Sequence, residues 1–183
     1  MPTRRKPRTA RRRRTKPKPR IPAGFHTITP YLAVVGGAAA MEFYKKAFGA
    51  RELLRQLTPD GKLIHGRLKI GDSMLFLSDV FQGSDRTAPS TLETTTVALH
   101  VYTTDVETLW NRAVAAGATV TMPLEDQFWG ERYGHLRDPF GHHWSLSMPI
   151  RMSRKEREEK RRAAMAMFDR GEHPSHEPPE SDA

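Results

Sequence analysis

The sequence predicts an α+β fold: two tandem modules, each a strand, a helix and three further strands, followed by a separate helix. Hydrophobic periodicity and turn residues predict this order of elements twice along the chain. The two copies also register at an offset of roughly 70 residues. The matching pairs are Gly49 with Gly117, His65 with His135, and Gly71 with Gly141. A repeat of this size indicates a tandem duplication.

The first module is expected over about residues 25–79. Residues 26–35 read as a strand that a pair of glycines ends. Residues 38–48 carry apolar side chains at helical spacing, and Gly49 is placed as the C-terminal cap. Short turns then separate three predicted strands, at residues 51–58, 62–70 and 73–78.

The second module is expected over residues 95–148, after a polar linker at residues 80–94. It begins with a predicted strand, and Asp105 is a natural N-cap for the helix that follows. The predicted elements are a strand at 95–102, a helix at 106–116, and strands starting at 119, 132 and 142.

The sequence Asp138-Pro-Phe-Gly141 is a tight-turn signature, because Asp bonds its own backbone, Pro fixes φ and Gly accepts a positive φ. After it, residues 143–147 alternate polar and apolar side chains. This alternation predicts a strand between an apolar layer and a polar surface or cavity.

Residues 149–183 contain a helix predicted over 153–168, where Ser153 and Glu156 form a capping box. The last dozen residues are proline-rich, and residues 1–20 lack apolar periodicity. Both ends are therefore expected to be disordered, because they cannot bury enough surface to offset the entropy of ordering. Residues 21–148 remain as the single folded domain.

The net charge of +9 belongs to the N-terminal arm and not to the folded domain. Residues 1–20 hold eleven Lys or Arg and no acidic residue, so the remaining chain carries a net charge of −2. Such a block of charge can attract nucleic acid or an acidic surface, and salt weakens the attraction. It offers no arrangement of side chains that would recognise a particular base sequence. Weak nucleic-acid contact through the arm and a solvated tail are both left open.

The chain has no cysteine, which excludes disulfides and Cys-ligated metal centres. No apolar run reaches the roughly 18 residues that a membrane span needs. The basic N-terminus is not followed by the apolar segment of a secretory signal. We therefore expect a cytoplasmic protein without a membrane partner.

Several short motifs in order resemble the vicinal oxygen chelate superfamily of glyoxalase, bleomycin-resistance and dioxygenase proteins, and its PhnB-like branch most. They are TPYLAV, MEFYKKAFGA, PDGKLIHGRLKIGDS, FWGERYG and DPFGHHW, and the similar region covers about two thirds of the chain, residues 25–148. The resemblance implies βαβββ modules that form an open, eight-stranded, barrel-like cleft, and we expect a homodimer.

Members of this superfamily typically hold a divalent metal through His, Glu or Gln on matching strands of both modules. Carried over to this chain, those positions fall on Thr29, Ala98 and Ser145, with a fourth near Leu75. None of these side chains is a good metal ligand. The resemblance therefore implies a cleft without the usual metal, and no cofactor is expected.

Strand alternation adds further candidates, because residues two apart share a face. If Ala98 and Ser145 face the cleft, His100 and His143 face it as well. In the same way, Tyr31 faces the cleft if Thr29 does. His65 lies on a neighbouring strand. These imidazoles could converge as a general acid/base pair or a displaced metal site, or each could simply bond backbone or water.

The stretch from Trp129 to Tyr133 combines an aromatic face, a glycine hinge and a guanidinium, which is typical of a lid or wall. Trp129 and Arg132 are therefore candidate ligand contacts, beside Thr29, Tyr31, His143 and Ser145. The alternatives are that Trp129 closes the core and that Arg132 forms an ion pair.

Two functions remain open. The first is a small-molecule-binding protein of the bleomycin-resistance type, which needs shape and aromatic walls but no metal. The second is an enzyme of lyase, isomerase or dioxygenase type that uses His65 or His100 as the base, with Arg132 on an anionic oxygen. The ligand itself cannot be named from the sequence, because a fold does not fix its chemistry.

Overall fold

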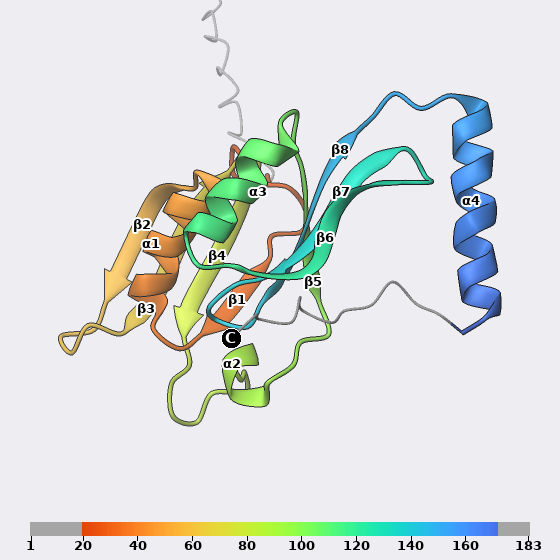
Figure 1. Ribbon diagram of the computed structural model, residues 1–183. Helices are drawn as coiled ribbons and strands as arrows, with labels where there is room; N and C mark the ends of the chain where they lie inside the picture. Colours follow the sequence, from red (N-terminus) through yellow and green to blue (C-terminus); the bar gives the residue numbers. More distant parts are fainter. Residues whose placement is uncertain (1–19, 172–183) are drawn as a thin grey trace, which may run out of the picture.

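Eight strands form two separate four-stranded sheets in the computed structural model, which describes residues 20–171 (Figure 1). The basic arm at 1–19 and the end at 172–183 lie outside the described residues. The first sheet has the order β1-β4-β3-β2 and the second β5-β8-β7-β6. In each, the first strand runs parallel to the last and the other neighbours are antiparallel. The predicted tandem βαβββ repeat is confirmed. Within the described residues each module forms its own sheet, and no strand of one sheet pairs with a strand of the other.

The first module contains β1 (Tyr31–Val34), α1 (Gly37–Phe48), β2 (Arg51–Leu57), β3 (Leu63–Ile70) and β4 (Ser73–Asp79). Strand β1 begins five residues later than predicted, since its ladder with β4 starts at Tyr31. Helix α1 ends at Gly49, whose φ of 65° is the left-handed conformation that the predicted cap requires. At the other end of α1, Oδ1 of Asp79 accepts hydrogen bonds from the backbone N–H groups of Gly36 and Gly37.

The second module contains β5 (Ala98–Tyr102), α3 (Val106–Ala115), β6 (Thr119–Gln127), β7 (Glu131–Arg137) and β8 (His143–Pro149). Asp105 caps α3 as predicted, because its carboxylate accepts a hydrogen bond from the backbone N–H of Thr108 at 3.1 Å. Gly141 closes the turn between β7 and β8 at φ 89°. Asp138 accepts bonds from the N–H groups of Phe140 and His142, which is the side-chain bonding that the turn signature predicts.

Helices α1 and α3 lie side by side, each over one face of its own sheet, and the core fills the space between them (Figure 1). The Trp144 ring packs at a tilt against Phe48, with 4.2 Å between ring centroids, and contacts Tyr44 as well. Trp144 is only 2% exposed. The alternation predicted for residues 143–147 is therefore present, with Trp144 on the packed side of β8.

Two elements lie outside the repeat. The linker predicted to be a loop contains one helical turn, α2 (Pro89–Leu92), which starts at a proline, a favoured first helical residue. The predicted C-terminal helix is α4 (Arg154–Asp169), with the Ser153 capping box in place. Helix α4 lies beyond the outer end of β6 and β7 (Figure 1), where Nζ of Lys160 donates a 2.9 Å hydrogen bond to the backbone oxygen of Asp126, and none of the residues of α4 is buried. Within residues 20–171 no helix has both the length and the apolar composition to cross a membrane.

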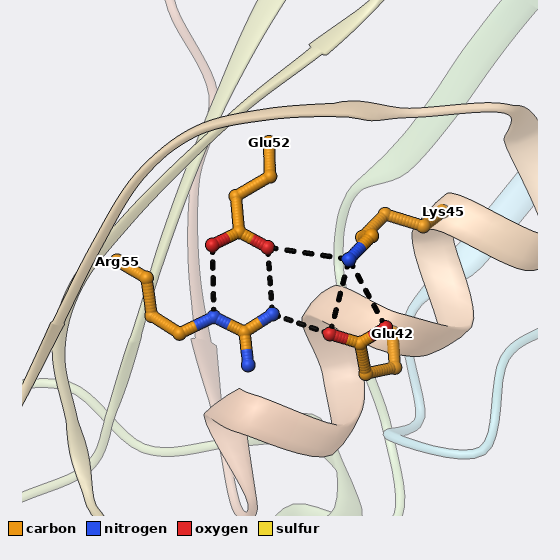
Figure 2. A network of polar contacts seen from close by, with 4 residues as sticks. All are labelled: Glu42, Lys45, Glu52 and Arg55. Carbon is orange, nitrogen blue, oxygen red and sulfur yellow. Dashed lines mark hydrogen bonds and ion pairs between the residues drawn. The ribbon is translucent and has the colours of Figure 1, made fainter.

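A polar network ties α1 to the first strand that follows it (Figure 2). Arg55 on β2 donates to Glu52 at 3.0 Å and 2.7 Å and also contacts Glu42 on α1. Lys45 bridges the same two carboxylates. Lys45 and Arg55 thus each pair with both Glu42 and Glu52.

Candidate functional site

A cavity of about 710 Å³ lies at the seam between the two modules, and we call it the seam cavity. The first module supplies the end of β3, the start of β4 and the segment before β1. The second supplies the edge strand β5. The lining residues are His26, Ile28, Pro30, Phe48, residues 70–75, residues 99–103, Leu109 and Trp144. Most of this lining is apolar, as in sites that take an organic ligand.

His100 is the sequence-predicted catalytic candidate that lines the seam cavity. It stands on β5 opposite Ser145 of β8, and its Nδ1 lies 2.8 Å from the Ser145 hydroxyl oxygen. The His100 ring also stacks over Tyr133 at 5.8 Å. His135 reaches the same Tyr133, with Nε2 at 2.6 Å from the phenol oxygen. These residues share the open face of the second sheet, which we define as the face turned away from α3.

Glu131 gathers the polar groups at the end of this open face. Its carboxylate accepts hydrogen bonds from the hydroxyl of Ser147 at 2.8 Å, Nε1 of Trp129 at 3.1 Å and the hydroxyl of Tyr102 at 3.2 Å. Burial tends to raise the pKa of Glu131, but these bonds outweigh burial and lower the pKa from its ordinary value. Glu131 is therefore an ionised carboxylate that holds the side chains of Tyr102, Trp129 and Ser147 in place on the open face.

His65 lies on the open face of the first sheet, the face turned away from α1. Its Nδ1 is 3.2 Å from the hydroxyl oxygen of Tyr31, and its ring contacts both Tyr31 and Phe76. Burial lowers the pKa of His65, and the charge of Arg67 adds to the effect. Near neutral pH His65 is thus an uncharged imidazole within an aromatic patch.

The predicted site residues do not form one constellation. No hydrogen bond or ring contact joins His65, His100 and His143 within residues 20–171. His143 lies on the same face of β8 as Ser145, opposite Ala98. Thr29 precedes β1, half-buried.

Arg132 projects from the other face of β7. It forms ion pairs with Glu107 of α3 and, at 2.7 Å, with Asp126 of β6. These partners raise the pKa of Arg132, the bond to Asp126 contributing most. The structure therefore does not bring Arg132 to the open face, whereas Trp129 does reach it, through Glu131 and an edge contact with Tyr133.

Two residues of the open faces were missed by the sequence reasoning: Glu131 and Arg67. Glu131 lies two positions before Tyr133 on β7, and Arg67 lies two positions after His65 on β3. Each therefore takes the same face of its strand as that neighbour. The period of two along a strand could have found both.

A family model for the Glyoxalase/Bleomycin resistance protein/Dioxygenase superfamily matches residues 24–146. The chain belongs to this superfamily. An uncharacterized protein of Mycobacterium tuberculosis is 50% identical over 127 residues, which cover 68% of this chain and 75% of that protein.

Solved structures share the superfamily fold. A PhnB protein from Bacillus cereus matches with a TM-score of 0.54 at 21% identity, over 67% of this chain and 99% of that one. TnmS3, an antibiotic binding protein from a Streptomyces species, matches with a TM-score of 0.51 at 23% identity, over 68% and 95%. At these identities the likeness shows the fold alone.

The residues at the superfamily's usual metal positions do not fit a divalent ion. Ser145 is 3% exposed and its hydroxyl is engaged by His100, while Leu75 is 4% exposed in the core. Ala98 offers only a methyl group. Across residues 20–171, no three His, Asp or Glu side chains gather in a way that could hold a metal. The open faces instead offer aromatic rings, imidazoles, the guanidinium of Arg67 and a single carboxylate among the groups described above, Glu131, which already accepts three hydrogen bonds.

Proposed function

We propose that this protein binds a small organic molecule in the seam cavity, as a binding protein of the bleomycin-resistance type that does not use the usual divalent metal. The single observation that carries the proposal is the cavity itself. Its volume of about 710 Å³ lies within the range of roughly 300–1,000 Å³ that small-molecule sites occupy. TnmS3, which has the same fold, is an antibiotic binding protein.

The chemistry of the cavity wall supports binding by shape. Phe48, Leu99, Val101 and Trp144 supply apolar surface from both modules, and His100 supplies a polar group among them. Burying an aromatic ligand against such side chains is worth about 25 cal/mol per Å² of apolar surface removed from water. An apolar wall with a few polar groups is the usual composition of a ligand pocket.

The test is a thermal-shift screen of aromatic antibiotics, including bleomycin, against the wild-type chain and two matched variants. Val101→Trp places a large ring in the cavity, whereas Val114→Trp places it on α3, where Val114 is 40% exposed and outside the cavity. We expect compounds that raise the Tm of wild type and of Val114→Trp but not that of Val101→Trp. A screen without such compounds, or equal shifts in both variants, would contradict the proposal.

A second candidate function is catalysis with His100 as the general base. The contact that favours it is the 2.8 Å distance between His100 Nδ1 and the Ser145 hydroxyl, at the edge of the cavity. His65 is the other candidate base. If a compound from the screen is converted on incubation, His100→Ala should reduce the turnover rate by about 10²-fold or more while leaving binding largely intact. Unchanged turnover would remove His100 from this role.

We also propose a homodimer. Large apolar side chains remain exposed in the single chain, among them Ile28 at 84%, Val97 at 64% and Tyr102 at 64%. They border the edge strand β5 and the segment before β1, and exposed apolar surface of this kind favours association. Light scattering after gel filtration should give twice the mass of the chain, and a monomer at micromolar concentration would contradict the proposal.

For the arm at residues 1–20 we propose weak, salt-sensitive contact with nucleic acid. The support is its charge, eleven Lys or Arg without an acidic residue. Deleting residues 1–20 should abolish retention on DNA at low salt. Retention of the shortened chain would contradict this reading.

A further inference from the structure

The guanidinium of Arg67 lies on the open face of the first sheet and has no carboxylate partner among the residues that the structure describes. It stands over two rings, 5.3 Å from the centroid of Phe25 and 5.4 Å from that of Phe76. Its Nε is buried and has no hydrogen-bond acceptor within residues 20–171. A buried donor without an acceptor is costly, about 1–3 kcal/mol, so this group is poised for an acceptor that the described residues do not supply.

A second guanidinium lies on the same aromatic patch. Arg86 stands 4.5 Å from the centroid of the Tyr31 ring. Tyr31 in turn contacts Phe76, with ring centroids 5.8 Å apart, and His65 contacts both rings. We call these residues the guanidinium cluster: Phe25, Tyr31, His65, Arg67, Phe76 and Arg86.

Two other arginines on strands of this fold have carboxylate partners. Arg55 is held by two carboxylates (Figure 2), and Arg132 also pairs with two. In the part of the chain that the structure describes, neither Arg67 nor Arg86 forms an ion pair. Uncompensated cations on aromatic rings, beside a cavity, are an arrangement suited to a planar anion, because a guanidinium binds a carboxylate through two parallel hydrogen bonds.

The guanidinium cluster adjoins the seam cavity. Met74 and Pro30 line the cavity, and Met74 lies on the same face of β4 as Phe76, two residues before it. The backbone oxygen of Pro30 accepts a hydrogen bond from the N–H of Phe76 at 2.9 Å. The end of the seam cavity at Met74 and Pro30 is therefore next to the strand face that carries Phe76 and Arg67.

We infer that the ligand of this cleft is an aromatic carboxylate, with its ring in the seam cavity or on the aromatic patch and its carboxylate bound by Arg67 and Arg86. This inference rests on the proposed binding function and adds the chemical class of the ligand. A carboxylate approaching Arg67 side-on also gives the buried Nε its acceptor. Phe25 lies in the irregular segment before β1, so its ring can move aside without breaking a strand.

The experiment compares two probes of nearly equal shape, 2-naphthoate and its neutral amide 2-naphthamide, by calorimetric titration of the full chain. The variants are Arg67→Gln, Arg86→Gln and, as a control that removes the same charge, Arg151→Gln at an exposed position after β8. The full-length arm is present in all of them, so its non-specific attraction for anions cancels in the comparison. Arg86 is exposed, so its variant tests the inference even if Arg67→Gln unfolds.

We expect wild type to bind naphthoate at least about tenfold more tightly than naphthamide, since a hydrogen bond between two charged groups is roughly twice as strong as one to a neutral group. Arg67→Gln and Arg86→Gln should each erase most of that difference and leave the naphthamide affinity within twofold, while Arg151→Gln should behave as wild type. Equal affinity for the two probes, or losses shared by Arg151→Gln, would overturn the inference. In that outcome, naphthamide binding that Val101→Trp abolishes would leave the proposed binding function standing, and no binding of either probe would count against both.

Discussion

The hydroxyl of Tyr44 donates a 2.8 Å hydrogen bond to Oδ2 of Asp138, and the two residues are 94 positions apart in the chain. Tyr44 belongs to the helix of the first module and Asp138 to the turn of the second. The same oxygen accepts a bond from Nε1 of Trp144 at 2.9 Å. Burial, followed by the neighbouring charge of Asp138, raises the pKa of Tyr44 well above its ordinary value, so the phenol keeps its proton. This buried contact sets how the two modules meet, and thereby the seam cavity.

Removing this contact should loosen the junction of the modules. We expect Tyr44→Phe to lower the free energy of unfolding by about 1–2 kcal/mol, because one of the two buried hydrogen bonds to this oxygen is lost while Nε1 of Trp144 still donates the other. Asp138→Asn should cost more, because both Asp138 oxygens accept bonds and an amide nitrogen would face donors. Urea denaturation measures both. An Asp138→Asn protein as stable as Tyr44→Phe would show that the junction does not depend on acceptors there.

Two glycine turns with nearly equal backbone angles should respond differently to a methyl group. Gly61 has φ 85° and open space around its would-be Cβ, whereas Gly141 has φ 89° and a would-be Cβ only 2.8 Å from the backbone nitrogen of Ser90. Gly61→Ala should cost about 1 kcal/mol of backbone strain, and Gly141→Ala clearly more, because α2 must also move. Equal Tm losses would mean that α2 does not pack on this turn as described.

His142 makes the stability of the fold depend on pH. Burial lowers its pKa, and the ring nitrogen Nε2 lies 3.2 Å from the carbonyl oxygen of Ala33 in the first module. Because the unfolded chain takes up this proton first, near pH 6.5, the contribution of neutral His142 is present above that pH and is lost as pH falls through the folded pKa. Unfolding free energies measured from about pH 7.5 to pH 5.5 should fall less steeply for His142→Gln than for wild type. Identical slopes would assign the pH dependence to other groups.

Much of the architecture could be predicted from the sequence because it is written in local patterns. The paired positions Gly49 with Gly117 and Gly71 with Gly141 place backbone turns that only particular residues favour, and the predicted order of elements is confirmed. The start of β1 could not be predicted in this way. It depends on where β4 provides a partner, which is a long-range pairing.

The site was harder to predict, because it depends on which face each side chain takes. Arg132 drew attention by lying among aromatic residues, yet Tyr133 beside it takes the open face and Arg132 the other. Nothing in the sequence marks Arg67 as a site residue, because an arginine in a strand is expected to have an acidic partner. Its lack of one emerges only when Glu42, Glu52 and Asp126 are seen to be engaged elsewhere.

We propose that side chains at the seam of the two modules hold the ligand without the superfamily's usual metal. The most direct test is a calorimetric titration of the strongest compound from the screen, run once with an excess of EDTA and once with added Mn²⁺ or Zn²⁺. We predict dissociation constants that agree within about twofold, because Thr29, Ala98 and Ser145 offer no metal ligands of the usual kind. A tenfold or larger loss of affinity in EDTA that Mn²⁺ or Zn²⁺ restores would contradict the account.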